Sequence, residues 1–275
     1  MIIENKTFDE ERALYGTENV TAISCRFDGP ADGESAFKES CDIKVKDCFF
    51  NLRYPFWHTH TLNVEDCEMT ALCRAALWYS DGISIKNCRL HGIKALRECE
   101  NVSIEDSSII SPEFGWFSKN VSIENSSAES EYFFLRGENL NFRNVKFKGK
   151  YSFQYIKNCT FTNCDFDTKD AFWHAENITV KNCRVKGEYL AWYSKNITFI
   201  DCEISGTQPL CYCEGLKMIN CTLLDADLSF EKSEVEAQLI SPVISIKNPK
   251  SGYISLPSYD ELILTEKSDC RIITN

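Results

Sequence analysis

The chain lacks the features of a membrane-bound or exported protein. Its 275 residues contain no apolar stretch long enough to span a bilayer, and the opening Met1–Glu10 segment has neither the basic start nor the apolar run of a secretory signal. We therefore expect a cytoplasmic protein without a membrane partner. In a reducing cytoplasm the 15 cysteines, an odd number, are expected to be free thiols.

The chain is also short of positive charge. It carries 41 acidic and 30 basic residues, and the resulting net charge of −11 repels phosphate backbones and anionic lipids. We therefore expect no nucleic-acid partner, and an anionic polysaccharide would need a local basic patch. With 43% apolar residues, the chain has enough hydrophobic material for a substantial core.

A short pattern repeats along the chain. It reads Asn-(Ile/Val)-x-(Ile/Val/Phe)-x-(Asn/Asp)-(Cys/Ser), and its last position recurs every 19 residues from Cys88 to Cys221. Insertions lengthen the series toward Cys25, and the signature disappears after Phe230. Alternating apolar and polar residues indicate two short strands with a corner between them, and a third strand completes the coil.

A coil of this length has no room for a packed helix. The sequence therefore predicts an all-β, right-handed parallel β-helix, a solenoid of about eleven coils of roughly 19 residues with N- and C-terminal caps. We assign residues 1–27 to an N-terminal cap and first coil, 28–232 to regular coils, and 233–275 to irregular last coils and a C-terminal cover, all within a single domain. In the first segment, Glu11–Tyr15 is expected to cap the strand edges of the first coil.

Two columns of corner residues have a structural interpretation. Asparagine or aspartate precedes the cysteine in most coils, because asparagine tolerates a left-handed backbone and its amide can hydrogen-bond to the asparagine of the next coil. The cysteines of successive coils point in the same direction and cannot converge on one zinc ion. We therefore expect small buried fillers, no metal site and no cofactor at Cys164, Cys183, Cys202 and Cys221.

The third strand carries the functional prediction. All five tryptophans occupy one position of it, and the position before them is apolar, so the tryptophans should point outward. Sugar rings stack on flat aromatic rings and polar groups bind hydroxyls, which predicts an oligosaccharide or another small molecule as the ligand. Alternatively, the stacked side chains only stabilise the sheet. The predicted binding residues are Glu39, Trp57, His58, Arg74, Trp78, Tyr79, Trp116, Trp173, Trp192 and Tyr193.

Two clusters in this stripe are candidates for catalysis. The carboxylates of Asp170 and Glu188, one coil apart, could lie within the range that glycosidases use, with His174 tuning them, or could instead belong to a solvated ion-pair network. Arg97 beside Glu98 offers the anion clamp and base of a polysaccharide lyase. Hydrolase, lyase and non-catalytic binding or scaffold protein with a glycan or protein partner stay open, as does the oligomeric state.

Several motifs resemble those of a bacterial family, domain of unknown function 3737. They are Phe8-Asp-Glu-Glu-Arg-Ala-Leu-Tyr, Ala75-Ala-Leu-Trp-Tyr-Ser, Asp170-Ala-Phe-Trp and Gly187-Glu-Tyr-Leu-Ala-Trp. The resemblance covers most of the chain and implies a right-handed parallel β-helix without an established activity, so no catalytic residue can be carried over. Pectate lyases and polygalacturonases are more distantly similar. Their aspartate triad and calcium-binding acidic cluster have no evident counterpart here, so this analogy concerns the fold alone.

Overall fold

The computed structural model describes residues 1–29 and 33–274, which form strands and turns. Within these residues there is no helix that could cross a membrane. Contacts divide the chain into two compact units, Met1–Glu138 and Asn139–Asn275. Both units are built from stacked β-coils, and each is described by itself.

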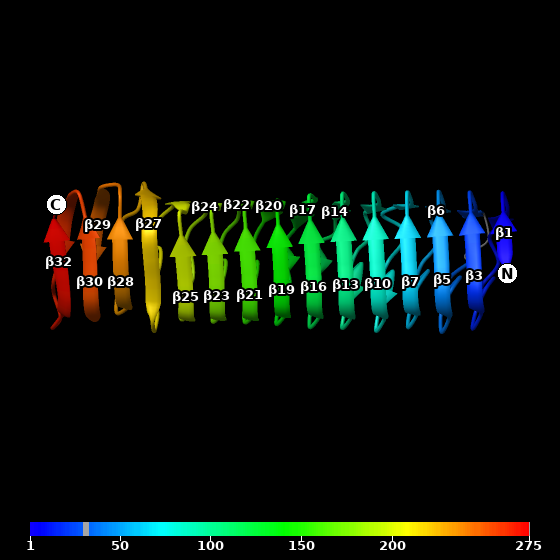
Figure 1. Ribbon diagram of the computed structural model, residues 1–275, viewed down its shortest axis with the longest axis horizontal. Helices are drawn as coiled ribbons and strands as arrows, with labels where there is room; N and C mark the ends of the chain where they lie inside the picture. Colours follow the sequence, from blue (N-terminus) through cyan, green and yellow to red (C-terminus); the bar gives the residue numbers. More distant parts are fainter. Residues whose placement is uncertain (30–32, 275) are drawn as a thin grey trace. The chain divides into compact units, whose positions relative to one another are not determined.

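In the first unit, one parallel sheet receives a strand from every coil (Figure 1). Each of its strands pairs in parallel with the strand of the next coil. The strands are β1 (Ile2–Glu4), β3 (Glu18–Ile23), β5 (Cys41–Lys46), β7 (His60–Glu65), β10 (Asp81–Lys86), β13 (Glu100–Glu105) and β16 (Lys119–Glu124).

Beyond a sharp corner, a second parallel sheet forms the next wall of this unit. Its strands are β2 (Thr7–Phe8), β4 (Arg26–Phe27), β6 (Phe49–Phe50), β8 (Glu68–Met69), β11 (Arg89–Leu90), β14 (Ser108–Ile110) and β17 (Ser127–Ser130). The third wall has only short pairs, β9 (Leu77–Trp78) with β12 (Leu96–Arg97) and β15 (Glu113–Phe114) with β18 (Tyr132–Phe133).

The second unit begins within β19 (Glu138–Arg143) and repeats the plan. Its first sheet contains β21 (Lys157–Thr162), β23 (Glu176–Lys181), β25 (Lys195–Ile200), β27 (Leu216–Leu224), β28 (Glu234–Leu239), β30 (Ser251–Leu256) and β32 (Asp269–Thr274). Its second sheet contains β20 (Lys146–Gly149), β22 (Asp165–Asp167), β24 (Arg184–Lys186) and β26 (Glu203–Ser205). In the last coils β29 (Val243–Lys247) pairs with β31 (Tyr259–Ile263).

The predicted fold class is confirmed, but the number of coils was set too low. The described residues make about 14 turns of roughly 19 residues, because the first and last coils form paired strands without the Asn-Cys signature. The segment expected to cap the first coil is instead part of its third wall. Arg12 and Leu14 donate backbone hydrogen bonds of 2.8 and 2.9 Å to the carbonyls of Glu34 and Ala36 in the next coil.

The third wall is not a regular strand in most coils. In the second unit, the backbone enters the left-handed region at every second residue, with φ of 53° at Asp170, 60° at Phe172 and 53° at His174. The N–H groups of alternate residues then point in opposite directions along the stack. Phe172 donates to Ser152 of the coil before, whereas His174 donates to Trp192 of the coil after. This wall is therefore held by coil-to-coil hydrogen bonds despite its unfavourable dihedral angles.

Side chains that point inward fill each coil with aliphatic and phenylalanine side chains. In the first unit, Phe27 and Phe50 stack with centroids 4.7 Å apart, and in the second unit Phe153 and Phe172 stack at 5.1 Å. The column before the tryptophan position faces this core, as predicted. Its fully buried members include Phe56, Leu77, Leu96, Phe134, Phe153, Phe172, Ala191 and Leu210.

Asparagines form ladders at two corners of the coil. At the predicted corner, Asn182 has a φ of 51° and its Nδ2 donates to Oδ1 of Asn163 at 2.7 Å. A second ladder lies at the start of the first sheet, where Asn196 donates to Asn177 at 3.1 Å and has a φ of 52°. The Asn-x-Ser/Thr sequences therefore have a structural origin, because the second ladder includes Asn101, Asn120, Asn177 and Asn196.

The corner cysteines hydrogen-bond from coil to coil. The N–H of Cys164 donates to Sγ of Cys183 at 3.2 Å, and this Sγ lies 3.2 Å from the carbonyl oxygen of Lys181. Serine performs the same role where the N–H of Cys88 donates to Oγ of Ser107 at 3.0 Å. Cysteine and serine both suit this corner, because each is small and can accept and donate a hydrogen bond; Val145 occupies the same position without doing so.

Candidate functional site

In the second unit, the tryptophan column forms a half-buried ladder on the outside of the third wall. Trp173 and Trp192 stack face to face, with centroids 5.6 Å apart and planes 6° from parallel. Tyr189 packs edge-on against Trp192 at 5.2 Å. The faces of the two indoles therefore cover each other, and their edges point to solvent. The sequence predicted that a sugar would stack on the ring faces. Because these two faces cover each other, a ligand would contact the ring edges instead.

The indole N–H groups are already used within the fold. Nε1 of Trp173 donates to the carbonyl oxygen of Tyr189 at 2.6 Å, and Nε1 of Trp192 donates to that of Gln208 at 2.8 Å. One coil earlier, Nε2 of Gln154 makes the equivalent bond to the carbonyl of Asp170 at 3.1 Å. These bonds satisfy backbone carbonyls of the third wall. The sequence did not reveal this structural role of the column.

A second aromatic column runs beside the tryptophans and is more exposed. Tyr155, His174, Tyr193 and Tyr212 stack with centroids 4.8, 5.1 and 4.8 Å apart and with planes 10° to 11° from parallel. Tyr155 and Tyr193 are 40% and 43% exposed. The phenol of Tyr212 bonds to Glu231 at 3.2 Å, and burial together with this carboxylate raises the pKa of Tyr212 to about 12. The column presents ring edges and polar tips to solvent.

Asp170 precedes Trp173 in the same coil and is mostly buried. The residue is 7% exposed, and burial raises the pKa of its carboxyl, with a smaller contribution in the same direction from Glu188 and an opposing one from Lys169. Among the described residues, no group donates a hydrogen bond to this carboxyl. A carboxyl group with a raised pKa beside an exposed surface is a candidate acid.

Glu188 forms an ion pair with Lys169 and lies close enough to Asp170 to contribute to its raised pKa. Its Oε2 lies 2.9 Å from Nζ of Lys169, and both side chains are about half exposed. Nζ of Lys169 also lies 5.6 Å from the ring centre of Tyr189. The backbone N–H of Asp170 donates to the carbonyl of Glu188 at 3.1 Å, which joins the two coils here. Of the two alternatives for this cluster, the structure shows the ion pair.

The first unit carries a ladder of tryptophans with cations stacked on them. Trp57 and Trp78 have centroids 5.0 Å apart, and Lys38 lies 5.6 Å from the centre of Trp57. The guanidinium of Arg97 lies between Trp78 and Trp116, at 5.0 and 5.6 Å from their ring centres. Such cation–π contacts stabilise the wall and cover the ring faces.

The remaining predicted residues of the first unit form ion pairs or ring contacts with near neighbours, except for the exposed Arg74. Nε of Arg97 lies 3.2 Å from Oε1 of Glu98, and Nδ1 of His58 lies 2.5 Å from Oε2 of Glu39. Tyr79 is 40% exposed and packs against Trp57 and Trp78 at 5.5 and 5.9 Å, whereas Arg74 is exposed. Because Arg97 is held between two indoles, it is not a freely accessible anion clamp.

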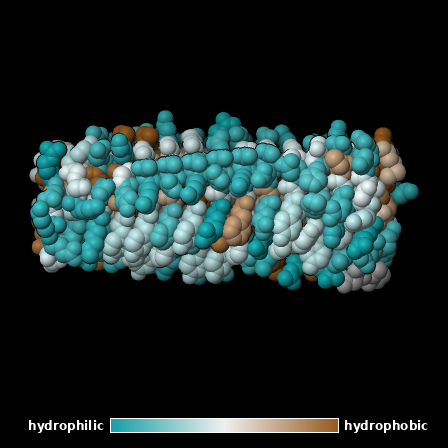
Figure 2. All heavy atoms as spheres, turned by 90° about the horizontal axis from the view of Figure 1, so that it is seen from below, coloured by the Kyte–Doolittle hydropathy of each residue, from teal (hydrophilic) through white to brown (hydrophobic). Residues whose placement is uncertain are grey.

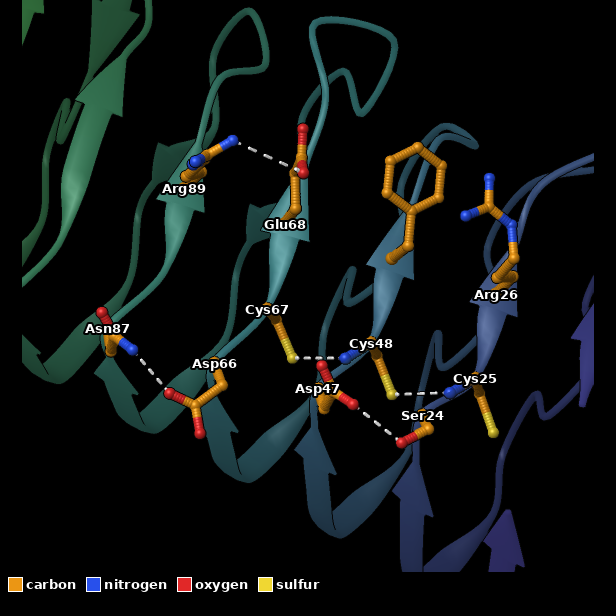
Figure 3. Close-up of a pocket in the computed structure, with 11 residues that line it drawn as sticks. Ser24, Cys25, Arg26, Asp47, Cys48, Asp66, Cys67, Glu68, Asn87 and Arg89 are labelled. Atoms are coloured by element: carbon orange, nitrogen blue, oxygen red, sulfur yellow. Dashed lines mark hydrogen bonds and ion pairs between the residues drawn. The ribbon is translucent and has the colours of Figure 1, made fainter. Parts of the chain in front are cut away.

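Hollows also lie away from the stripe, at places that the sequence did not indicate. One of about 560 Å³ follows the corner of the first unit (Figure 3). Another, of about 590 Å³, lies on the last coils of the second unit. The first is lined by Ser24, Cys25, Arg26, Asp47, Cys48, Phe49, Asp66, Cys67, Glu68, Asn87 and Arg89.

The surface seen in Figure 2 is mostly hydrophilic or near neutral in hydropathy, and strongly apolar residues are scattered on it. This face shows no continuous apolar patch of the kind that marks a large protein interface.

Comparisons with solved structures find other proteins of low sequence identity. A surface adhesin of Streptococcus pneumoniae, PfbA, is 10% identical with a TM-score of 0.48, and the match covers 94% of this chain and 91% of that one. The A-module of the mannuronan C-5 epimerase AlgE4 from Azotobacter vinelandii is 9% identical with a TM-score of 0.33, over 99% and 89% of the two chains.

A mannuronic acid-specific polysaccharide family 6 lyase from human gut microbiota is 9% identical with a TM-score of 0.32, over 99% of this chain and 77% of that one. No curated protein matches the sequence. The model of one family, described as protein of unknown function (DUF3737), matches residues 1–273. The chain therefore belongs to the DUF3737 family.

Proposed function

We propose that this protein binds a carbohydrate on the third wall of its second unit. The observation that carries the proposal is the exposed aromatic column Tyr155, His174, Tyr193 and Tyr212, which runs beside the half-buried Trp173 and Trp192. Aromatic side chains with polar tips are well suited to a ligand that is apolar on its ring faces and rich in hydroxyls.

The stacking within the columns determines how a glycan would bind. Ring faces are covered by neighbouring rings, so the sugar would lie across the exposed ring edges and hydrogen-bond to the tips of Tyr155, His174 and Tyr193. Lys169 and Glu188, which are about half exposed at the margin of the columns, offer a donor and an acceptor to further hydroxyls. A neutral glycan is favoured, because the net charge of −11 opposes a polyanion.

The test is a glycan array followed by calorimetric titration of the best neutral oligosaccharide. We expect Tyr193→Ala to weaken binding by about tenfold or more, since alanine scanning finds that buried aromatic contacts dominate binding energy. Tyr79→Ala is the matched control, because Tyr79 has the equivalent position and similar exposure in the first unit. Unchanged affinity in Tyr193→Ala, or an equal loss in both variants, would contradict the proposed site.

Cleavage of the bound glycan is a second candidate function, which the raised pKa of Asp170 favours. In this scheme Asp170, whose pKa burial raises, would protonate the glycosidic oxygen, while Glu188 would assist a water molecule. Product analysis on the array hits tests it. We expect Asp170→Asn to abolish release of reducing ends while leaving affinity within about twofold of the original. Binding without turnover by the unaltered protein would leave the binding function alone.

A further inference from the structure

The aromatic column Tyr155, His174, Tyr193 and Tyr212 places one ring on each coil at an almost constant interval. Successive ring centroids are 4.8, 5.1 and 4.8 Å apart, and successive planes are 10° to 11° from parallel. Rings stacked in this way project their polar edges side by side. We propose that the ligand is a linear, unbranched glycan in an extended conformation, which lies along the stack with one sugar over each ring. This ligand class presupposes the carbohydrate-binding function proposed above.

The interval between the rings suits the length of one sugar unit. Neighbouring coils are separated by the strand spacing of a sheet, about 4.8 Å. A pyranose ring that is linked through equatorial bonds at its opposite ends lengthens a glycan chain by close to the same distance, because the linking bonds continue the long axis of the ring. An axial bond instead bends the chain, and its sugars curve away from a straight row. The column therefore favours β-1,4-linked chains over α-1,4-linked ones.

The edges of these rings supply the hydrogen-bonding groups that hydroxyls need. A phenol both donates and accepts a hydrogen bond, and a neutral imidazole has one nitrogen of each kind. Among the described residues, no group makes a hydrogen bond with the imidazole of His174 or with the phenol of Tyr193. These two neighbouring edges are therefore available to hydroxyls of two successive sugars.

His174 reaches less far from the wall than the rings on either side of it. An imidazole is shorter than a phenol, so the edge of His174 stands back between the tips of Tyr155 and Tyr193. All three side chains are exposed, the two tyrosines to 40% and 43%. A hydroxyl of the central sugar can enter this notch and reach the imidazole, with a phenol oxygen on each side. A branch on that hydroxyl would fill the notch, which is why the chain should be unbranched.

The row of available edges ends at Tyr212 within the second unit. The phenol of Tyr212 is already hydrogen-bonded to Glu231 at 3.2 Å, and the side chain is less exposed than that of Tyr193. Tyr212 therefore offers less to a ligand than the three rings before it. We expect three principal sugar positions, over Tyr155, His174 and Tyr193.

The equivalent column of the first unit does not repeat this arrangement. It consists of Glu39, His58, Tyr79, Glu98 and Phe117. Its glutamates form ion pairs, Glu39 with His58 and Glu98 with Arg97, and Phe117 has no polar tip. A glycan laid along these coils would find a single phenol, that of Tyr79. Tyr79 therefore provides a matched control within the chain.

The test is calorimetric titration of the full-length protein with oligosaccharides of increasing length. Three β-1,4-linked series, of glucose, mannose and N-acetylglucosamine, are compared with α-1,4-linked glucose, from disaccharide to hexasaccharide. For at least one β-1,4-linked series, we expect the affinity to rise by about threefold to tenfold from disaccharide to trisaccharide, the gain from roughly one further hydrogen bond, and to change little in longer chains. The affinity for the α-1,4-linked series should not rise with length.

Tyr193→Phe keeps the stacked ring and removes only its polar tip. We expect it to weaken binding of the trisaccharide by about threefold to tenfold, the loss of one hydrogen bond. The disaccharide should lose less than about twofold, because it can still lie over Tyr155 and His174. Tyr79→Phe should change neither affinity.

Three outcomes would overturn the extended chain while leaving carbohydrate binding in place. They are an affinity that does not depend on chain length, tighter binding of α-1,4-linked or branched glycans, and an equal loss for disaccharide and trisaccharide in Tyr193→Phe. Failure to bind any glycan on the array would instead contradict the proposed function itself, and the extended chain with it.

Discussion

At the scale of single residues, the burial of Asp170 disfavours the charged form of its carboxyl group. The residue is 7% exposed, no group among the described residues donates a hydrogen bond to its carboxyl, and burial raises its pKa. The folded protein therefore holds the Asp170 proton more tightly than the unfolded chain does. Stability is lost as the pH rises from the ordinary range of aspartate through the raised pKa, and above that pKa the loss is complete.

Asp170→Asn removes the charge and keeps the shape of the side chain. We expect the variant to be more stable than the original at neutral pH, because burial penalises the charged form of the carboxyl and asparagine carries no charge. The difference should vanish at about pH 3, where the carboxyl is protonated in both states. Urea unfolding at several pH values measures it. A gain in stability that does not change with pH would contradict the electrostatic cause.

The indole N–H of Trp173 offers a second residue-scale prediction. Trp173→Phe leaves the carbonyl of Tyr189 without its donor and should lower the free energy of unfolding by about 1 to 2 kcal/mol. Tyr193→Phe is the control. Its phenol makes no hydrogen bond among the described residues, so it should change stability by less than about 0.5 kcal/mol. Denaturant unfolding curves of the two variants decide whether the tryptophan column has this structural role.

Residue-level sequence reasoning identified which columns face outward but not what the tryptophans bond to. Outward orientation follows from the apolar residue before each tryptophan, such as Phe172 before Trp173. The bond from Trp173 to Tyr189 depends on a carbonyl that is free only because the wall alternates between left- and right-handed dihedral angles. Bulky residues such as Phe172 and Tyr189 rarely adopt positive φ, so no local sequence preference predicts this wall.

At the scale of structural elements, the corner between the first and second sheets is the feature that repeats most regularly from coil to coil. Asn182 combines a φ of 51° with an amide bond to Asn163. Asn182→Ala should lower stability by about 1 to 3 kcal/mol, because alanine is strained at this φ and cannot make the amide bond. Asn182→Gly removes the same bond without the strain.

The glycine variant at position 182 should therefore lose less stability than the alanine variant. The difference between the two free energies of unfolding isolates the backbone contribution, and the remaining loss in Asn182→Gly isolates the ladder bond. Equal losses in the two variants would mean that the left-handed backbone costs nothing at this corner, contrary to the expectation.

The elements best predicted from the sequence were those with simple alternation and a corner signature. Strands such as β23 and β24 flank Asn182, and the repeat identifies all three. Coils at the ends were missed because β1 and β32 pair through backbone groups without a side-chain signature. The thiol-lined hollow could not be predicted either, since its volume depends on how side chains from several coils pack around Cys48.

At the scale of the whole molecule, the charge is unbalanced but locally paired. Lysines on one coil pair with glutamates on the next, as in Lys157–Glu176 at 3.0 Å and Lys195–Glu214 at 3.0 Å. Exposed pairs of this kind contribute about 0 to 1 kcal/mol each. The excess of 41 acidic over 30 basic residues produces repulsion over longer distances.

Salt should therefore stabilise this protein. At about 150 mM ionic strength, repulsion beyond about 8 Å is screened, whereas ion pairs at contact distance are weakened less. We expect the melting temperature to rise by about 2 to 5 °C between about 10 mM and 150 mM sodium chloride. Differential scanning calorimetry provides the measurement, and a fall in melting temperature would show that the ladder pairs outweigh the net charge.

The in-register stacking of identical corners makes the length of the chain adjustable. Asn163 and Asn182 occupy equivalent places 19 residues apart, and so do the cysteines that follow them. Excising residues 164–182 would join Asn163 directly to Cys183, so that β21 leads into β24 and the coil closes with its native corner. Nothing in the remaining coils needs to shift except by one strand spacing. Gain or loss of whole coils is then a mutation that a polypeptide of this kind can survive, and it offers a route by which related sequences could come to differ in length without differing in architecture.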